Sequence, residues 1–216
     1  MIIGLVGFIG AGKGTVADIL VEKHGFIKES FANSVKDAVS VIFGWDRSSL
    51  EGDTPESRRW REQPDEFWSN KLGKEFSPRL ALQLMGTEAG RDVFHTNLWV
   101  HTVERRCSKN KNYVIADVRF PNEILAIKAM GGKVFRVKRG FDPEWFNTAQ
   151  RQNITPEDDL WLLEDHNELM EQKYPDVHYS EWAWIGQEVD GTIWNDTTFE
   201  DLKKRVDIVV DGLYNI

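Results

Sequence analysis

The sequence predicts an α/β protein with a three-layer fold around a parallel β-sheet. An apolar run, Ile2 to Val6, is separated by a glycine-rich turn from a segment with helical spacing. A second apolar run, 113–116, is followed by helical spacing over 121–130 and by a third apolar run at 133–137. This alternation of strand, helix and strand implies parallel strands joined by right-handed crossovers.

The N-terminal part predicts two pairs of strand and helix. The run Ile2 to Val6 is nearly continuous in apolar residues, which is typical of a strand buried on both faces of a parallel sheet. From Lys13 onward the apolar residues fall on one helical stripe, and the helix is expected to end near Gly25. A short strand at 26–31 and a helix at 34–43 follow.

Residues 44–78 predict a polar insertion before the next helices. The segment is crowded with charged residues and turn formers, yet it has aromatic side chains that would anchor it, namely Trp45, Trp60, Phe67 and Trp68. The spacing of Leu, Met, Val and Trp residues predicts helices at 79–90 and 97–107.

The C-terminal part returns to regular elements. Pro121 suits the first turn of the helix after the strand at 113–116. The final helix has apolar residues at helical spacing over 199–213, and Thr197 and Glu200 have capping-box spacing at its start. Between these parts, residues 141–189 contain twelve acidic residues and two basic ones, Arg151 and Lys173. We expect this acidic insertion to avoid phosphate along most of its length.

Composition excludes several classes of protein. With 216 residues, 41% of them hydrophobic, the chain can build one substantial core and is not intrinsically disordered. Its net charge of −8 argues against nonspecific nucleic-acid binding. The single Cys107 offers neither an intramolecular disulfide nor a cysteine zinc cluster. No secretory signal and no apolar run of the ~20 residues that a membrane span needs are found, so we expect no membrane partner and a cytoplasmic location.

The turn after the first strand has the spacing of a phosphate-binding loop, Gly7-Phe8-Ile9-Gly10-Ala11-Gly12-Lys13-Gly14-Thr15. A position between a strand and a helix is the context that this P-loop pattern requires. Backbone N–H groups and the helix N-terminus would surround phosphate oxygens, and Lys13 would reach the β- and γ-phosphates. The candidate ATP-binding residues are Gly10, Ala11, Gly12, Lys13, Gly14 and Thr15.

The loop departs from the usual P-loop pattern at one position. Gly14 follows the lysine where Ser or Thr is usual, and Thr15 comes one residue later. This Lys-Gly-Thr variant resembles adenylate kinases and other nucleoside monophosphate kinases. Thr15 is the candidate ligand for Mg²⁺ from this loop, although the shift makes that assignment less direct than in the usual pattern.

Charged residues follow the second and third apolar runs, at the sheet edge where open α/β proteins bind ligands. Asp117 would stand near Mg²⁺, and an N-cap or turn aspartate is the alternative reading. Arg119 would neutralise charge on a transferring phosphoryl group, and a surface salt bridge is the alternative reading. Among Arg136, Lys138 and Arg139 we favour Arg139 for a similar catalytic role.

Short segments in order along nearly the whole chain match one family. Besides the P-loop they are Phe31-Ala32 with Lys36-Asp37-Ala38, Phe43-Gly44-Trp45-Asp46, Glu51-Gly52-Asp53 with Arg58, Leu82-Gln83 with Gly86-Thr87-Glu88 and Arg91, Trp99-Val100, Asp117-Val118-Arg119-Phe120-Pro121-Asn122-Glu123, Ala129-Met130-Gly131-Gly132, His178 with Ser180-Glu181, and Asn195-Asp196. Each segment is weak evidence alone. Their order and spacing together resemble the phage-type deoxynucleoside monophosphate kinases.

The resemblance implies an activity and a domain plan. The activity is transfer of the γ-phosphoryl group of ATP to a deoxynucleoside 5′-monophosphate (dNMP) with Mg²⁺, in the host cytoplasm if a phage encodes the chain. The plan is a single P-loop kinase domain over 1–216, with an NMP-binding helical insertion at 33–100 and an acidic lid-like insertion at 141–189.

The resemblance also implies the residues of the acceptor site, which are Lys36, Arg58, Gly86, Thr87 and Arg91. Arginine can hold a phosphate bidentately, and glycine allows close approach of a ligand. Each of the three cations has a structural alternative: Lys36 as a solvated helix residue, Arg58 as one charge of a polar loop, and Arg91 as a helix-terminal cation.

Two other functions compete with this reading. A dephospho-coenzyme A kinase has a similar start to residues 3–17. That family places acidic residues after its second strand, and the corresponding stretch here, Glu29-Ser30-Phe31-Ala32-Asn33, does not match that pattern. A nucleotide-dependent interaction module would bind ATP without turnover. Base choice, the basis of a deoxyribose preference and oligomeric state stay open, with a homodimer as one option. So do the role of His178 to Glu181 and the choice between Arg139 and Arg151 as the cation of the lid.

Overall fold

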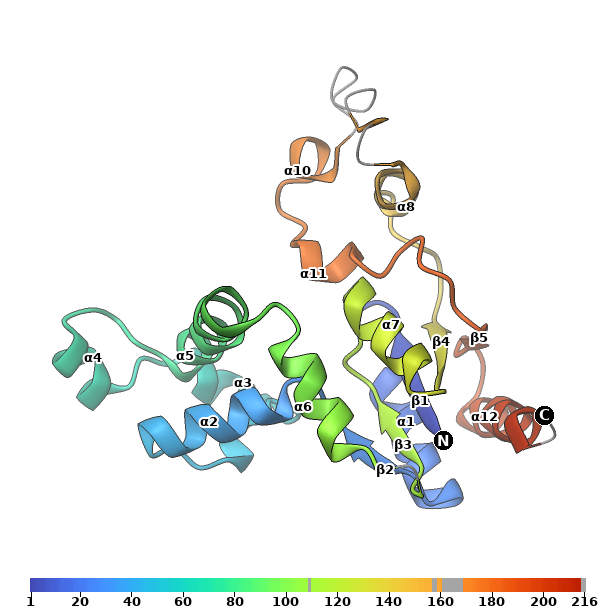
Figure 1. The fold of residues 1–216 in the computed structure, drawn as a ribbon, viewed down its shortest axis with the longest axis horizontal. Coiled ribbons are helices and arrows are strands. Elements are labelled where there is room, and N and C mark those ends of the chain that lie inside the picture. Colours follow the sequence, from blue (N-terminus) through green and yellow to red (C-terminus); the bar gives the residue numbers. More distant parts are fainter. Residues whose placement is uncertain (109, 157–158, 161–168, 215–216) are drawn as a thin grey trace. The chain divides into compact units, whose positions relative to one another are not determined.

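A computed structural model describes residues 1–108, 110–156, 159–160 and 169–214 (Figure 1). The chain forms two compact units, one made of Met1–Glu29 with Cys107–Ile216 and the other of Ser30–Arg106. The first unit contains a five-stranded sheet in the order β2-β3-β1-β4-β5, and all four strand pairs are parallel. The strands are β1 (Ile2–Val6), β2 (Ile27–Glu29), β3 (Tyr113–Ile115), β4 (Lys133–Lys138) and β5 (Gly191–Trp194).

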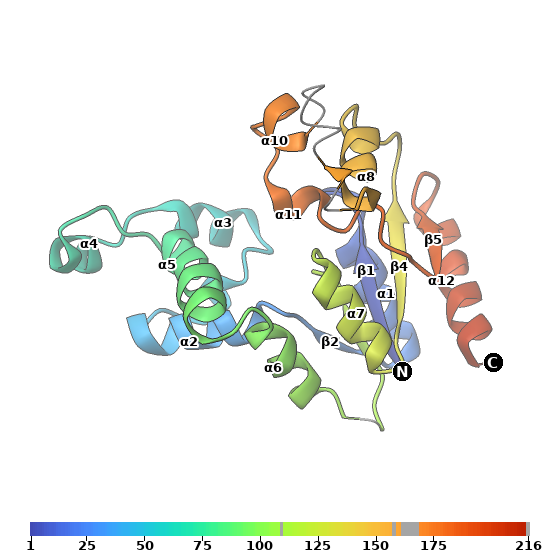
Figure 2. The same cartoon turned by 45° about the horizontal axis from the view of Figure 1, so that its top comes forward.

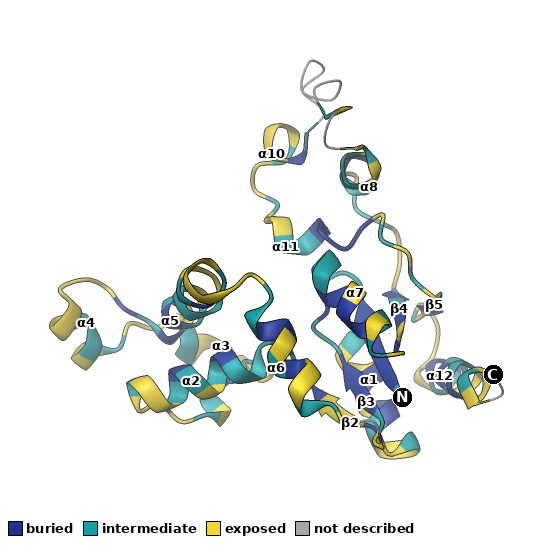
Figure 3. Cartoon of the chain, viewed as in Figure 1, coloured by how far each residue is buried: buried dark blue, intermediate teal, exposed yellow. Residues whose placement is uncertain are grey.

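The predicted α/β fold with a parallel sheet is confirmed, and β1 is its central strand. All five residues of β1 are buried, as their continuous apolar pattern predicts (Figure 3). Side chains alternate across a strand, so Ile3 and Leu5 face one side of the sheet and Gly4 faces the other. Ile3 and Leu5 belong to the core that helices α1 (Lys13–His24) and α12 (Phe199–Tyr214) complete.

Helix α7 (Pro121–Ala129) packs on the opposite face of the sheet (Figure 2). A Cβ atom added at Gly4 would lie 2.6 Å from the Ile127 side chain, so the glycine allows the close packing of α7 on β1. Helices on both faces of a parallel sheet give the three layers that the sequence predicts.

The chain between β4 and β5 contains the helices α8 (Phe146–Ile154), α10 (Met170–Lys173) and α11 (Tyr179–Trp182). Met170 is fully buried, and its backbone N–H donates to the Gln152 side chain of α8 at 2.7 Å. Part of the predicted acidic insertion, including Glu157, Asp158, Glu164, Asp165 and Glu168, lies outside the described residues.

The second unit is helical. Its elements are α2 (Asn33–Phe43), the 3₁₀ turn η1 (Ser48–Leu50), α3 (Pro55–Glu62), α4 (Glu66–Leu72), α5 (Pro78–Leu84), the π-helix η2 (Met85–Phe94) and α6 (Leu98–Arg106). Its core contains the buried residues Val39, Trp45, Leu50, Phe76 and Ala81.

Aromatic anchoring of the polar segment is found for three of the four expected residues. Trp45 stacks on Phe43 at 4.8 Å between ring centroids, and Trp60 and Trp68 pack against the same core. The expectation that Phe67 is an anchor is wrong, because this residue is 59% exposed and lies outside this core.

The π-helix differs from the α-helix expected over 79–90. One closing hydrogen bond runs from the His95 N–H to the Gly90 carbonyl at 3.2 Å, a separation of five residues. Gly90 is buried against the Trp99 ring, and a Cβ atom there would collide with that ring. Trp99 donates its indole N–H to the Gly86 carbonyl at 2.8 Å. Trp99 therefore fixes this segment from α6, and its role in the unit is structural.

The cap of α12 lies one residue later than expected. Thr198, rather than Thr197, accepts from the N–H of the residue three positions on, Asp201, at 3.2 Å. Asp201 in turn accepts from the Thr198 hydroxyl at 2.8 Å. None of the helices in the described part of the chain is both long and apolar enough to cross a bilayer.

Candidate active site

The predicted phosphate loop connects β1 to the first turn of α1. The residue before this helix is Gly12, whose φ of +98° is in the left-handed region that favours glycine. Glycine has no side chain to accept from the first N–H groups of the helix, so these groups and the positive end of the helix dipole remain available for an anion.

Close contacts with two neighbouring segments explain why the loop needs glycine at positions 7 and 12. A Cβ atom at Gly7, whose φ is +142°, would collide with the Val137 carbonyl of β4. A Cβ atom at Gly12 would collide with the Asn195 amide, which donates to the Ala11 carbonyl at 2.9 Å. Asn195 therefore supports the loop from the segment after β5, a contact that the sequence pattern alone does not predict.

Lys13 is held inside the loop. Its Nζ donates to the Gly7 carbonyl at 2.6 Å and to the Phe8 carbonyl at 3.0 Å. Burial and, to a lesser extent, the positive charge of Arg119 lower the pKa of Lys13 to about 8, although Glu181 and Asp117 act in the opposite direction. Because their charges act on Lys13, the candidates Asp117 and Arg119 lie near it in the same site.

We expect ATP binding to weaken as the pH rises above about 8. Phosphate favours the charged form of Lys13, so bound ATP raises the pKa of this lysine. The affinity for ATP is therefore highest below the pKa that Lys13 has in the free protein. The dissociation constant should rise about 10-fold between pH 7 and pH 9. Calorimetric titration at both pH values measures it, and Lys13→Met should bind weakly without this step. Equal wild-type affinities at the two pH values would contradict the expectation.

Arg119 lies four residues after the end of β3, and its side chain is 45% exposed. Its Nη1 donates to the Ser180 hydroxyl and to Glu181 Oε1, both at 3.2 Å. The Arg119 backbone N–H donates to the carboxylate of buried Glu123 at 2.8 Å. The turn that carries the guanidinium is therefore fixed by α7, while the guanidinium itself is fixed by the chain around α11.

Arg139 follows β4 directly and is exposed. It lines a cavity of about 580 Å³ together with loop residues Phe8 to Ala11, Lys138 and Glu181. Of the three cations near this strand end, it is the one for which we propose contact with phosphate, because Arg136 and Lys138 both pair with Asp142. Arg151 lies in α8 and is exposed.

Arg136 is enclosed by aromatic rings from three parts of the first unit. Its guanidinium carbon lies 5.7 Å from the centroid of Phe8, 4.8 Å from that of Phe146 and 5.2 Å from that of Trp184. Such contacts are cation–π interactions. Trp145 adds an edge contact to Phe8 with centroids 5.3 Å apart. We call Phe8, Arg136, Phe146 and Trp184 the arginine cage; it links the phosphate loop to the chain between β4 and β5.

The residues present fit a magnesium ion that is held mainly by nucleotide. In the described part of the chain, no three His, Cys, Asp or Glu side chains cluster to form a metal site. Mg²⁺ characteristically uses one or two protein oxygens, several waters and substrate phosphates. Thr15, exposed in the first turn of α1, and Asp117, whose charge acts on the pKa of Lys13, would supply oxygen atoms of this kind.

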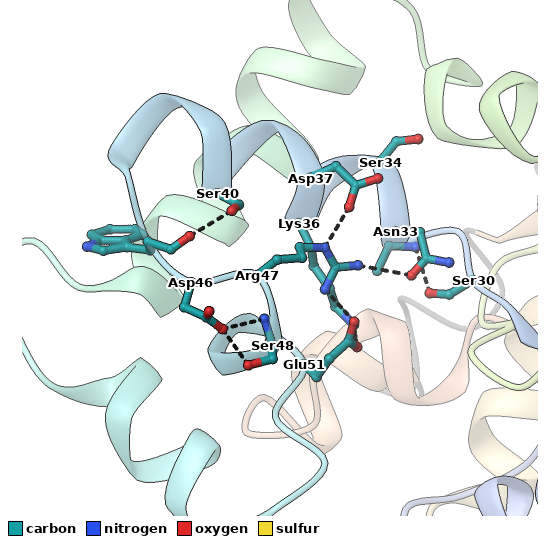
Figure 4. A network of polar contacts seen from close by, with 12 residues as sticks. Ser30, Asn33, Ser34, Lys36, Asp37, Ser40, Asp46, Arg47, Ser48 and Glu51 are labelled. Atoms are coloured by element: carbon teal, nitrogen blue, oxygen red, sulfur yellow. Dashed lines mark hydrogen bonds and ion pairs between the residues drawn. The ribbon is translucent and has the colours of Figure 1, made fainter.

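The acceptor residues implied by the resemblance all lie in the second unit. Lys36 of α2 pairs with Glu51 at 2.6 Å, and its side chain is only 14% exposed (Figure 4). Arg47 pairs with the same carboxylate and with Asp37, so Lys36 is part of a network rather than a solvated helix residue. Arg58 donates from Nε to the Gly52 carbonyl at 2.8 Å and from Nη2 to the Asp53 carbonyl at 3.2 Å.

Gly86, Thr87 and Arg91 lie together in the π-helix η2. In an α-helix, five residues rotate by ~500°, so Arg91 would point ~140° away from Gly86. In a π-helix the i to i+5 hydrogen bond stacks residues five apart on successive turns. The observed geometry thus places Arg91 on the side of the helix that carries Gly86, which an α-helix would not do.

A phosphate loop between the first strand and first helix of a three-layer α/β fold, with a lysine held in the loop, is the arrangement of a P-loop nucleotide-binding protein. No family model matches the chain. The Acanthamoeba polyphaga mimivirus protein named "Putative deoxynucleotide monophosphate kinase" is 34% identical over 152 residues, which cover 64% of this chain and 74% of that protein. The deoxynucleoside-5′-monophosphate kinase of Escherichia phage T5 is 49% identical over 49 residues, or 22% of this chain and 20% of that enzyme. The chain belongs to the deoxynucleotide monophosphate kinase family, and it is an ATP-dependent nucleotide kinase.

Solved structures of small-molecule kinases are distantly similar. Shikimate kinase from Aquifex aeolicus vf5 is 15% identical with a TM-score of 0.45, over 99% of this chain and 98% of that one. Dephospho-CoA kinase from Campylobacter jejuni is 15% identical with a TM-score of 0.37, over 98% of this chain and 96% of that one.

Proposed function

We propose that the protein transfers the γ-phosphoryl group of ATP to a dNMP, giving ADP and the deoxynucleoside diphosphate. A phosphate oxygen of the dNMP attacks the γ-phosphorus, the bond from this phosphorus to the β,γ-bridging oxygen breaks, and the electron pair stays on ADP. The observation that carries the proposal is Lys13, held within the phosphate loop and acted on by the charges of Arg119, Glu181 and Asp117.

The loop residues and nearby cations supply the electrostatic part of the catalysis. The backbone of Gly10 to Thr15 binds the phosphates of ATP, and Lys13 and Arg119 offset the negative charge on the transferring group. Arg139 adds a further cation at the end of β4. Mg²⁺, held by Thr15 and Asp117, would neutralise charge on the β- and γ-phosphates.

The second unit supplies the acceptor site in this proposal. It corresponds to the NMP-binding insertion proposed at 33–100, and dNMP would contact Lys36, Arg58, Gly86, Thr87 and Arg91. The π-helix supports this assignment, because it places Arg91 on the same side of the helix as Gly86, a glycine where phosphate can approach the backbone.

The insertion at 141–189 would act as the lid that excludes water from the reacting phosphates. An open site would let water attack ATP in place of the acceptor, so exclusion favours transfer over hydrolysis. Slow hydrolysis of ATP is expected when no acceptor is present.

A coupled assay of ADP release tests the proposed reaction. The protein is supplied with ATP, Mg²⁺ and each of dAMP, dGMP, dCMP and dTMP in turn, and the matched ribonucleotides and dephospho-coenzyme A serve as controls. We expect one or more deoxynucleotides to stimulate ADP release at least ~10-fold above the rate without acceptor. Stimulation by dephospho-coenzyme A alone would replace the proposed acceptor. ATP binding with no stimulation by any acceptor would leave a nucleotide-binding module and overturn the proposal.

A further inference from the structure

The segment His178 to Trp184 contacts two of the segments that carry proposed catalytic cations, the phosphate loop with Lys13 and the turn with Arg119. Trp184 packs on Phe8 of the phosphate loop with ring centroids 5.2 Å apart. Tyr179 lies 6.0 Å from Phe120, the residue after Arg119. We call His178 to Trp184 the return segment, because it brings the chain back from the insertion to the sheet.

Glu181 is the charged residue of this segment that faces the site. Its carboxylate accepts from Arg119 Nη1 at 3.2 Å, and its side chain, 27% exposed, lines the cavity beside the phosphate loop. Its backbone carbonyl accepts from the Trp184 indole at 3.0 Å. Glu181 is therefore anchored by a ring that itself packs on the phosphate loop.

A second acceptor on the segment reinforces the contact. The Ser180 hydroxyl accepts from the same Arg119 Nη1 at 3.2 Å and lies 2.9 Å from His178 Nδ1. His178 Nδ1 also accepts from the Ser180 backbone N–H at 3.2 Å. These contacts fix the Ser180 hydroxyl, one of the two oxygens that meet Arg119.

In the part of the chain that the structure describes, Arg119 is held through one nitrogen, Nη1. Among the described residues, its Nε and Nη2 have no hydrogen-bond partner, since both of its side-chain hydrogen bonds leave from Nη1. Arg136 differs, because three rings and Asp142 surround it. An arginine fixed at one nitrogen can offer the others to a phosphate oxygen, and fixing it in advance removes rotamer freedom that would otherwise be lost in the transition state.

We propose that Glu181 is a positioning residue for phosphoryl transfer, which holds Arg119 by Nη1 so that its remaining N–H groups meet the transferring phosphoryl group. The inference rests on the proposed function and deepens it. The competing arrangement is a latch, in which Glu181 occupies Arg119 until ATP displaces it. The two arrangements predict different effects when the Glu181 contact is removed. Loss of a positioning contact lowers kcat, whereas loss of a latch tightens ATP binding and leaves kcat intact or higher.

A double-mutant cycle tests the proposal on the full chain. Glu181→Gln, Arg119→Met and the double variant are compared with wild type in dNMP-dependent ADP release and in ATP hydrolysis without acceptor. Glu181→Gln should lower kcat about 10-fold with the KM for ATP changed less than about 3-fold, and Arg119→Met should lower kcat about 100-fold. The double variant should match Arg119→Met within about 2-fold, because Glu181 acts through Arg119.

Glu188→Gln is the matched control. Glu188 lies in the same insertion and pairs with Lys128 at 3.0 Å, but it is 90% exposed and does not line the cavity. This variant should keep the wild-type kcat. Ser180→Ala tests the same contact without a change of charge and should lower kcat by a smaller factor than Glu181→Gln.

Three results would overturn the proposal: an unchanged kcat in Glu181→Gln, tighter ATP binding with kcat intact, or losses that multiply in the double variant. The hydrolysis assay keeps this test separate from the proposed function. If no dNMP is phosphorylated, the acceptor assignment fails, yet the coupling of Glu181 to Arg119 is still decided by the rate of ATP hydrolysis.

Discussion

Replacing Lys13 with alanine is expected to lower dNMP-dependent ADP release by roughly 10³-fold or more. Lys13 Nζ is the cation inside the phosphate loop, and its hydrogen bonds to the Gly7 and Phe8 carbonyls hold it within the loop where we propose that phosphates bind. The assay is ADP release at saturating ATP. Lys23→Ala is the control, because Lys23 lies in the same helix and pairs with Asp207 away from the loop.

The same substitution should not lower the melting temperature Tm. The pKa of Lys13 falls to about 8 in the fold, below its ordinary value, so the folded state disfavours the charged lysine. That cost is fully present below pH 8 and disappears as the pH rises toward the unfolded pKa. Alanine removes this cost at neutral pH, and the removal offsets the loss of the two hydrogen bonds to the Gly7 and Phe8 carbonyls. A large fall in Tm in thermal unfolding would mean that Lys13 is structural and that the lost activity reports unfolding.

Sequence reasoning worked where a local pattern carries the information. The burial of β1 and the turn at Gly7 to Lys13 follow from hydrophobic periodicity and glycine spacing, and both depend on residues that are close in the chain. The position of Asp117 and Arg119 just beyond the end of β3 was predicted in the same way, from the short apolar run that precedes them. Their closeness to Lys13 follows from the parallel pairing of β1 and β3.

The π-helix could not be predicted from periodicity. Residues 79–90 have apolar spacing that fits an α-helix, and nothing in that pattern distinguishes an i to i+4 from an i to i+5 hydrogen bond. The deciding contact is the packing of Gly90 on Trp99, which comes from the next helix. The signal that the sequence offered for this departure from an α-helix was a glycine, Gly90, within an apolar helical pattern.

The acidic insertion forms ion pairs that could not be predicted from its sequence, for a similar reason. Its net charge predicts a segment that avoids phosphate, yet two of its carboxylates pair with cations near the phosphate loop: Asp142 with Arg136 and Lys138, and Glu181 with Arg119. A charge count cannot show which acids are matched by bases elsewhere in the chain. The net charge therefore describes the insertion less well than its individual ion pairs.

The Asp142→Ala variant is expected to lose about 3 kcal/mol in the free energy of unfolding. Asp142 pairs with Arg136 through Oδ1 and with Lys138 through Oδ2 at 2.7 Å, and all three side chains are at most 21% exposed. Its removal leaves two like charges two residues apart on β4 without their common counter-ion. Urea denaturation measures the loss. Asp18→Ala, which breaks an exposed pair with Lys28, should cost less than about 1 kcal/mol.

A second substitution distinguishes the contribution of the Arg136 charge from that of its packing against the aromatic rings. Arg136→Met in the Asp142→Ala background removes one of the two unpaired charges and leaves a flexible apolar side chain against Phe8, Phe146 and Trp184. Replacing a buried ion pair with apolar groups is often close to neutral, so the double variant should recover at least about half of the loss. If the double variant loses the sum of the free energies of unfolding that Asp142→Ala and Arg136→Met lose alone, the aromatic rings rather than Asp142 hold Arg136. The arginine cage would then keep Phe8 and the phosphate loop in place without the ion pair.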